Sequence, residues 1–227
     1  MPQKPYSSPV LRWLYENSLL LVGILLVLFT LGGQTLTGWL DNNSDLEEMH
    51  LVPLTLGQYL TSGHFLEATF ENWESEFLQM GLYVVLTIWL RQRGSSESKK
   101  LYEEEEVDKE PDPTKDDAPG PVKRGGWQLA LYRRSLSIAF FLLFFGAFWL
   151  HAKGGAEVYS IEQQHEGKPT VTTTEYMLTT RFWFESFQNW QSEFLSIVSI
   201  VGLSIFLRQH GSPQSKPVDA SHDETGE

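Results

Sequence analysis

Apolar side chains collect in four blocks along the chain, and the charged side chains collect between these blocks. Two of the blocks, residues 17–40 and 135–152, hold 24 and 18 residues without any Asp, Glu, Lys or Arg. A charged side chain at the centre of a bilayer costs about 2.5–3.5 kcal/mol, and a helix needs about 20 residues to cross the apolar layer. Both blocks are therefore predicted to be membrane-spanning helices.

The other two blocks, residues 77–90 and 194–207, have only 14 uncharged residues each. Extended back to residue 187, the last block includes a single charge, whereas extension of its counterpart to residue 70 includes three. Trp73 and Trp190 stand where an interfacial aromatic belt is expected. We therefore predict an all-α polytopic membrane protein with four transmembrane helices, at about 17–39, 70–91, 133–152 and 187–208. The aromatic segments before the second and fourth helices either form separate interfacial helices or extend the membrane helices.

The chain matches itself at an offset of 117 residues. Residues 70–99 and 187–216 share 17 identities in 30 positions, including Asn-Trp-x-Ser-Glu-Phe-Leu, which begins at Asn72 and at Asn189. Each half is thus predicted to be a helical hairpin, and the two hairpins form a parallel repeat. The predicted organisation is a first two-helix membrane repeat, a linker, a second two-helix membrane repeat and a tail, at 1–93, 94–126, 127–212 and 213–227.

The linker is rich in acidic residues and poor in apolar ones. It contains ten Asp or Glu residues, including the four consecutive glutamates at 103–106. Such a segment buries too little apolar surface to offset the entropy of ordering, so we predict that the linker and the tail are disordered. The linker is then a solvated tether or a docking segment.

Lys and Arg are distributed unevenly over the predicted loops. Fourteen lie in the N-terminal segment, the linker with its flanks and the tail, whereas the two hairpin loops hold three. By the positive-inside rule, both termini and the linker are predicted to be cytoplasmic.

One carboxylate is common to both halves at the mouth of the apolar blocks. Glu76 and Glu193 lie four residues after Asn72 and Asn189, so each pair shares a helix face. If these faces turn toward each other, they form an intramembrane polar site that exchanges protons or binds a cation. The alternative is that the motif lies at headgroup depth. There the interface anchors would be Trp73, Trp190, Arg91 and Arg208.

Other chemistry is not indicated by the sequence. The net charge of −12 argues against nucleic acid as a partner, and the chain has no cysteine. We find no phosphate-binding loop, nucleophile elbow or histidine pair at metal spacing, and the six histidines are expected to be mostly solvated. No catalytic residue, metal or cofactor is therefore predicted, and an enzyme is not expected.

The repeated Asn-Trp-x-Ser-Glu-Phe-Leu motif and the downstream Leu-Arg-Gln-x-Gly-Ser motif resemble an uncharacterised family of bacterial integral membrane proteins, a domain of unknown function. The resemblance implies a multi-pass protein of the bacterial cytoplasmic membrane, with no activity attached. We expect a structural, interaction or envelope-associated role, with the lipid bilayer and either a second copy or another membrane protein as partners. The alternative is a small ion or proton transporter or channel that uses Glu76 and Glu193. Glu71 and Glu74 depart from Gln188 and Gln191 of the second half.

Overall fold

The computed structural model describes residues 8–226, and over this range the chain contains helices and no strand. Residues 1–7 and 227, which include Lys4 and the extreme ends of the predicted first repeat and tail, lie outside the described residues. The α-helices are α1 (Pro9–Glu16), α2 (Ser18–Glu48), α3 (Leu56–Tyr59), α4 (Gly63–Trp89), α5 (Gly120–Arg124), α6 (Gly126–Tyr132), α7 (Ser135–His165), α8 (Thr173–Tyr176) and α9 (Thr180–Phe206), and Glu106–Asp108 forms a 3-10 turn, η1.

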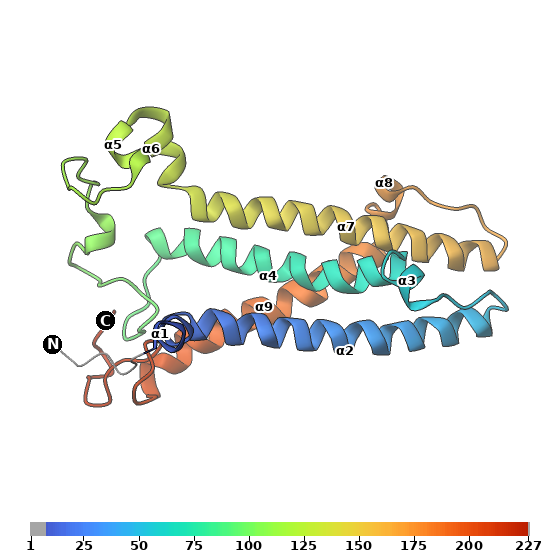
Figure 1. Ribbon diagram of the computed structural model, residues 1–227, viewed down its shortest axis with the longest axis horizontal. Coiled ribbons are helices and arrows are strands. Elements are labelled where there is room, and N and C mark those ends of the chain that lie inside the picture. The colour runs from blue at the N-terminus through green and yellow to red at the C-terminus, as the bar shows by residue number, and fades with distance from the viewer. Residues whose placement is uncertain (1–7, 227) are drawn as a thin grey trace.

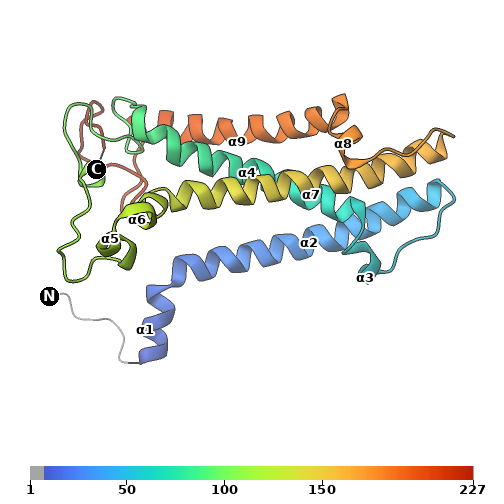
Figure 2. The same ribbon diagram turned by 90° about the horizontal axis from the view of Figure 1, so that it is seen from above.

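The four long helices, α2, α4, α7 and α9, run along the long axis of the molecule (Figure 1). We call the end with α3 and α8 the hairpin end. The opposite end, with α5, α6 and the described ends of the chain, is the linker end. Helix α1 turns sharply away from α2, as Figure 2 shows.

Helices α4 and α9 each continue without a break from the aromatic segment into the apolar block. Helices α4 and α9 begin at the hairpin end, where the side chains of Ser62 and Thr179 accept hydrogen bonds from the backbone N–H groups of Phe65 and Phe182. Such N-caps satisfy backbone donors that a helix start leaves free. The aromatic segments are therefore extensions of the long helices and not separate interfacial helices.

The two halves fold alike locally. Each bound of α7, α8 and α9 lies 117 residues after the corresponding bound of α2, α3 and α4. The loop contacts also correspond. Asn43 exchanges two hydrogen bonds with the backbone of Leu54, and Ser160, at the equivalent position, exchanges two with the backbone of Val171.

The packing between the halves is uneven, because α4 and α7 share by far the largest helix–helix interface. Gly63 and Gly154 allow their backbones to meet: a Cβ on Gly154 would lie 2.6 Å from the Gly63 carbonyl oxygen. Thr180 and Thr37 occupy the equivalent positions of α9 and α2. The methyl and hydroxyl groups of these threonines leave less room for backbone contact than the two glycines do, and α2 has no comparable interface with α9.

Burial is inverted relative to a protein that folds in water. The fully buried side chains include Glu74, His151 and Lys216, whereas Leu19 and Phe29 of α2 are 89% and 79% exposed. The small apolar core lies at the hairpin end, around Tyr176 and Phe182. Two helices, α2 and α7, are long and apolar enough to cross a membrane by length and composition. The four-span arrangement stays a prediction.

The predicted disorder of the linker and tail also stays a prediction. Within 94–126 the structure describes η1 and α5 with coil between them, and the linker pairs with the tail through hydrogen bonds from Gly94 to Thr225 and from Gly226 to Ser95. The tail itself is organised by Lys216, whose Nζ donates to three backbone carbonyl oxygens of the tail.

Candidate functional site: a buried charge network

A network of charged side chains lies buried between the long helices at the hairpin end. At its centre is His151 of α7, whose imidazole is completely buried. The ring nitrogen Nδ1 lies 3.1 Å from a carboxylate oxygen of Glu74 on α4, and Nε2 lies 3.4 Å from a carboxylate oxygen of Glu185 on α9. The second Glu74 oxygen accepts a hydrogen bond of 3.2 Å from the Trp190 indole N–H. One imidazole therefore bridges two carboxyl groups from different helices.

Glu185 is also the meeting point of a second group of polar side chains. The Tyr176 hydroxyl lies 2.6 Å from Glu185 and 3.2 Å from Glu67. Arg181 donates from Nε to Glu185 at 2.9 Å and from a terminal nitrogen to Glu162 at 2.5 Å. Because these residues belong to α4, α7, α8 and α9, the network ties all four elements together.

Local sequence places each of these groups. Arg181 and Glu185 are four residues apart on α9, the spacing that brings opposite charges together on a helix. Tyr176 ends the single turn of α8, which begins with a capping box between Thr172 and Glu175. Its ring crosses α7 at Gly155, where a Cβ would overlap the tyrosine ring. A glycine at 155 is therefore what lets the hydroxyl reach the network.

Aromatic rings cover the part of the network around His151 and Tyr176, whereas Arg181 and Glu162 are partly exposed. Phe182 lies against the His151 ring at a centroid separation of 4.9 Å and makes an edge contact with Tyr176 at 5.6 Å. Burial raises the pKa of the Tyr176 hydroxyl above its ordinary value, and the hydrogen bond to Glu185 raises this pKa further. Tyr176 therefore keeps its proton and acts as a hydrogen-bond donor.

Glu76 and Glu193, the predicted carboxylate pair, are near each other in the structure. One turn further on, the Gln79 amide donates to the Ser196 hydroxyl at 2.5 Å and to the Glu193 backbone carbonyl at 3.0 Å. Glu76 is exposed and Glu193 half-buried. Helices α4 and α9 thus contact each other through equivalent residues of the repeat, which are 117 positions apart. The Glu76–Glu193 pair lies outside the buried network.

The other predicted polar residues act locally. Asn72 and Asn189 each donate to the backbone carbonyl four residues earlier on their own helix, at Ala68 and Glu185. These bonds satisfy the amide groups within one helix, so neither asparagine bridges the two halves.

Of the predicted anchors, the two arginines have equivalent contacts. Arg91 donates to backbone carbonyls at the end of α4, including that of Ile88, and Arg208 does the same at the end of α9, including that of Ile205. Gly94 has a positive φ of 83° and lies in a turn four residues beyond the helix C-cap at Leu90.

The two predicted tryptophan anchors differ from each other. Trp73 is 38% exposed, whereas Trp190 donates to Glu74 and is part of the buried network. Trp190 is half-buried, and the role of both tryptophans as interface anchors stays a prediction.

Sequence reasoning missed the network itself. Histidines were expected to be mostly solvated, whereas His151 is fully buried, and Glu74 was noted only as a departure from Gln191. The difference between Glu74 and Gln191 was the sequence feature that could have indicated the network. Five charged members of the network differ in kind between the halves, whereas Glu162 corresponds to the acidic Asp45. Glu67, Glu74, His151, Arg181 and Glu185 correspond to Phe184, Gln191, Gln34, His64 and Ala68.

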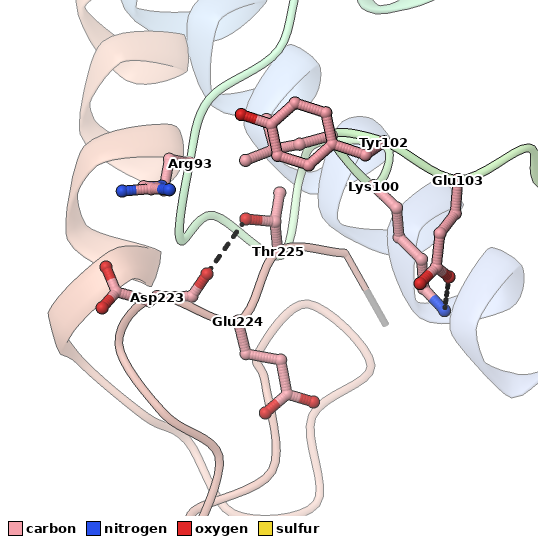
Figure 3. A pocket seen from close by; sticks show the side chains of 8 residues that line it. Arg93, Lys100, Tyr102, Glu103, Asp223, Glu224 and Thr225 are labelled. Carbon is pink, nitrogen blue, oxygen red and sulfur yellow. Dashed lines mark hydrogen bonds and ion pairs between the residues drawn. The ribbon is translucent and has the colours of Figure 1, made fainter.

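A groove of about 470 Å³ opens at the linker end, between the linker and the tail (Figure 3). Both signs of charge line it, and Lys100 pairs with Glu103. This mixed lining favours neither an anionic nor a cationic ligand. The groove is lined by Arg93, Lys100, Leu101, Tyr102, Glu103, Asp223, Glu224 and Thr225.

The chemistry available to the buried network is proton exchange and electrostatic pairing. Within residues 8–226, no group of three His, Asp or Glu side chains has an arrangement that could hold a metal ion. The fold and the network together define an all-helical protein with two helices that could cross a membrane, held at one end by buried ion pairs.

The chain belongs to the family described as "Domain of unknown function (DUF6766)", whose model matches residues 10–227. No curated protein and no solved structure matches the chain.

Proposed function

We propose that this protein is a four-helix integral membrane protein with a non-enzymatic structural or interaction role. The observation that carries the proposal is the inverted burial of the long helices. Exposed apolar side chains lie on all four, with Leu25, Trp89, Leu142 and Val198 between 64% and 69% exposed, while charged groups are buried between the helices. Apolar surface of this extent is unfavourable in water and is stabilised by lipid.

Helix lengths support the same proposal. At 1.5 Å per residue, the 27 residues of α4 and α9 span roughly 40 Å and the 31 residues of α2 and α7 roughly 46 Å. Both lengths exceed the apolar thickness of a bilayer, about 30 Å. From the start of α7 to His151 is roughly 24 Å, which puts the buried network near the membrane boundary on the hairpin side.

The proposed location is a bacterial inner membrane, and the Lys and Arg distribution supports a cytoplasmic linker end. The proposal predicts the labelling of single cysteines, because the native chain has none. In intact cells an impermeant maleimide is expected to label Val52→Cys and Thr170→Cys, in the two hairpin loops, and to label Thr114→Cys, in the linker, only after the membrane is permeabilised. All three positions are exposed.

The three positions also separate four spans from two. If only α2 and α7 crossed the membrane, Val52→Cys and Thr114→Cys would be on one side and Thr170→Cys on the other. That labelling pattern would contradict the proposal, as would release of the protein from membranes by alkaline carbonate.

Ion or proton passage is a second candidate function, favoured by one observation. The Glu76–Glu193 pair and the Gln79–Ser196 hydrogen bond place polar groups along the meeting faces of α4 and α9. Such groups are rare within membrane helices and commonly belong to ion pathways.

Purified protein in liposomes distinguishes the two candidates. A structural or interaction role predicts proton and potassium flux no greater than in protein-free liposomes. Passage predicts a flux that disappears when Glu76→Gln and Glu193→Gln are combined, and that persists in Glu71→Gln, the matched control outside the pair.

A further inference from the structure

The two contacts of His151 require more ring hydrogens than a neutral imidazole carries. Its Nδ1 faces Glu74 and its Nε2 faces Glu185, and each ring nitrogen is within hydrogen-bonding distance of a carboxylate oxygen. A neutral imidazole carries one N–H, and a carboxylate is only an acceptor. With both carboxyl groups ionised and the ring neutral, one contact would set a nitrogen lone pair against a carboxylate oxygen, which is repulsive.

We propose that the bridge Glu74–His151–Glu185 is a buried proton-binding site, in which a second ring proton makes His151 an imidazolium that links α4 to α9 through α7. The ligand of the site is the proton itself. This inference rests on side-chain geometry and does not require that the four helices span a membrane.

The charges around the ring favour the additional proton. The titratable and charged groups that face it or the bridge are Glu67, Glu71 and Glu74 from α4, Glu162 from α7, Tyr176 from α8, and Arg181 and Glu185 from α9. Five of these are carboxyl groups, and Arg181 is the one cation among them. A positive charge on His151 therefore lowers the repulsion around a ring that, together with Glu74, has no exposed side-chain surface.

The bridge also gives the proton a structural consequence. Glu74 is fully buried and also accepts a hydrogen bond from Trp190, whereas the contact from Nε2 is what joins α7 to Glu185 of α9. Loss of the second proton leaves one N–H to be shared between two acceptors. The attachment of α9 to α7 is then weakened, while Tyr176 and Arg181 still hold Glu185. The other half has Gln34 in place of His151 and Ala68 in place of Glu185, so it has no such site.

Nitrogen-15 NMR of the histidine rings tests the proposal in the full chain, reconstituted in lipid nanodiscs. At pH 7.5 His151 is expected to show hydrogens on both ring nitrogens. Solvated histidines, with an ordinary pKa of about 6.5, are expected to be largely neutral at the same pH. His151 is recognised as the ring whose hydrogens do not exchange rapidly with water, and its signal is absent in His151→Gln. A neutral His151 ring at pH 7.5 would overturn the proposal.

Two variants test whether the bridge is where the proton is held. Glu185→Gln is expected to cause the loss of one of the two ring hydrogens at pH 7.5, whereas Glu162→Gln, which removes a partner of Arg181 but no partner of His151, leaves both in place. Retention of both hydrogens in Glu185→Gln would contradict the assignment. If Glu185→Gln does not fold, titration of the unmodified chain from pH 5 to 8 decides: the proposal requires that His151 keeps both hydrogens while solvated rings lose one.

Discussion

Replacement of Gly154 by valine is expected to separate α4 from α7 and to lower the free energy of unfolding by about 3 kcal/mol, the upper end of the usual range for overpacking. A Cβ at this position would lie 2.6 Å from the carbonyl oxygen of Gly63, 2.9 Å from Cβ of Leu66 and in overlap with the backbone nitrogen of Glu67. Two of these three atoms are backbone atoms, so no change of side-chain rotamer relieves the clash. The movement must also displace Glu67, which is hydrogen-bonded to Tyr176.

Gly146→Val is the matched control, because it adds the same side chain to the same helix. No atom lies within 4 Å of a Cβ built at Gly146, and so the substitution should change stability little. The two variants are compared by unfolding in detergent micelles, followed by circular dichroism. Equal stabilities would mean that the close approach of α4 and α7 is not what holds these helices together.

The long helices were predictable because their pattern is local and repeated. Charge-free blocks marked the part of each helix nearest the linker end, and the 117-residue repeat identified equivalent positions. The lengths were underestimated: the sequence predicted a helix at about 17–39, whereas α2 continues to Glu48. Polar residues such as Asn42 and Asn43 lowered the apolar signal without interrupting the helix, since helices at the hairpin end also pack against loops.

The buried network was not predictable in the same way, because its partners are distant in the sequence. Glu74 and His151 are separated by 77 residues and Glu67 and Tyr176 by 109. A repeat comparison favours residues that both halves share, such as Glu76 and Glu193, yet these lie outside the network. Most charged members of the network lie at positions where the halves differ, whereas Tyr176 and Trp190 have identical counterparts in Tyr59 and Trp73. Asymmetry within a repeat was therefore the more informative signal for the buried contacts.

The same difference between the halves places glycines and charged residues together at the α4–α7 interface. Gly63 and Gly154 bring α4 and α7 together beside Glu67, and that approach puts Glu74 of α4 against His151 of α7. Close backbone packing excludes water from the polar groups, which strengthens each hydrogen bond but penalises any group left unpaired. The stability of the hairpin end therefore depends on complete pairing.

Substitution of Glu74 by alanine is expected to destabilise the protein most, by about 3–5 kcal/mol, the usual effect of removing one partner of a buried pair. Glu74 has no exposed side-chain surface and accepts hydrogen bonds from His151 of α7 and Trp190 of α9, so its loss leaves two buried donors without an acceptor.

Two further variants separate the causes of that loss. Glu74→Gln keeps the volume and one acceptor oxygen, and we expect about 1–3 kcal/mol from the weaker pairing with His151. Gln191→Ala, at the equivalent exposed position of α9, should change stability by less than about 0.5 kcal/mol. Unfolding in the same micelles measures all three. If Glu74→Ala proved no less stable than Gln191→Ala, the buried carboxylate would not link the helices, because the two positions are equivalent in the repeat and differ in burial and pairing.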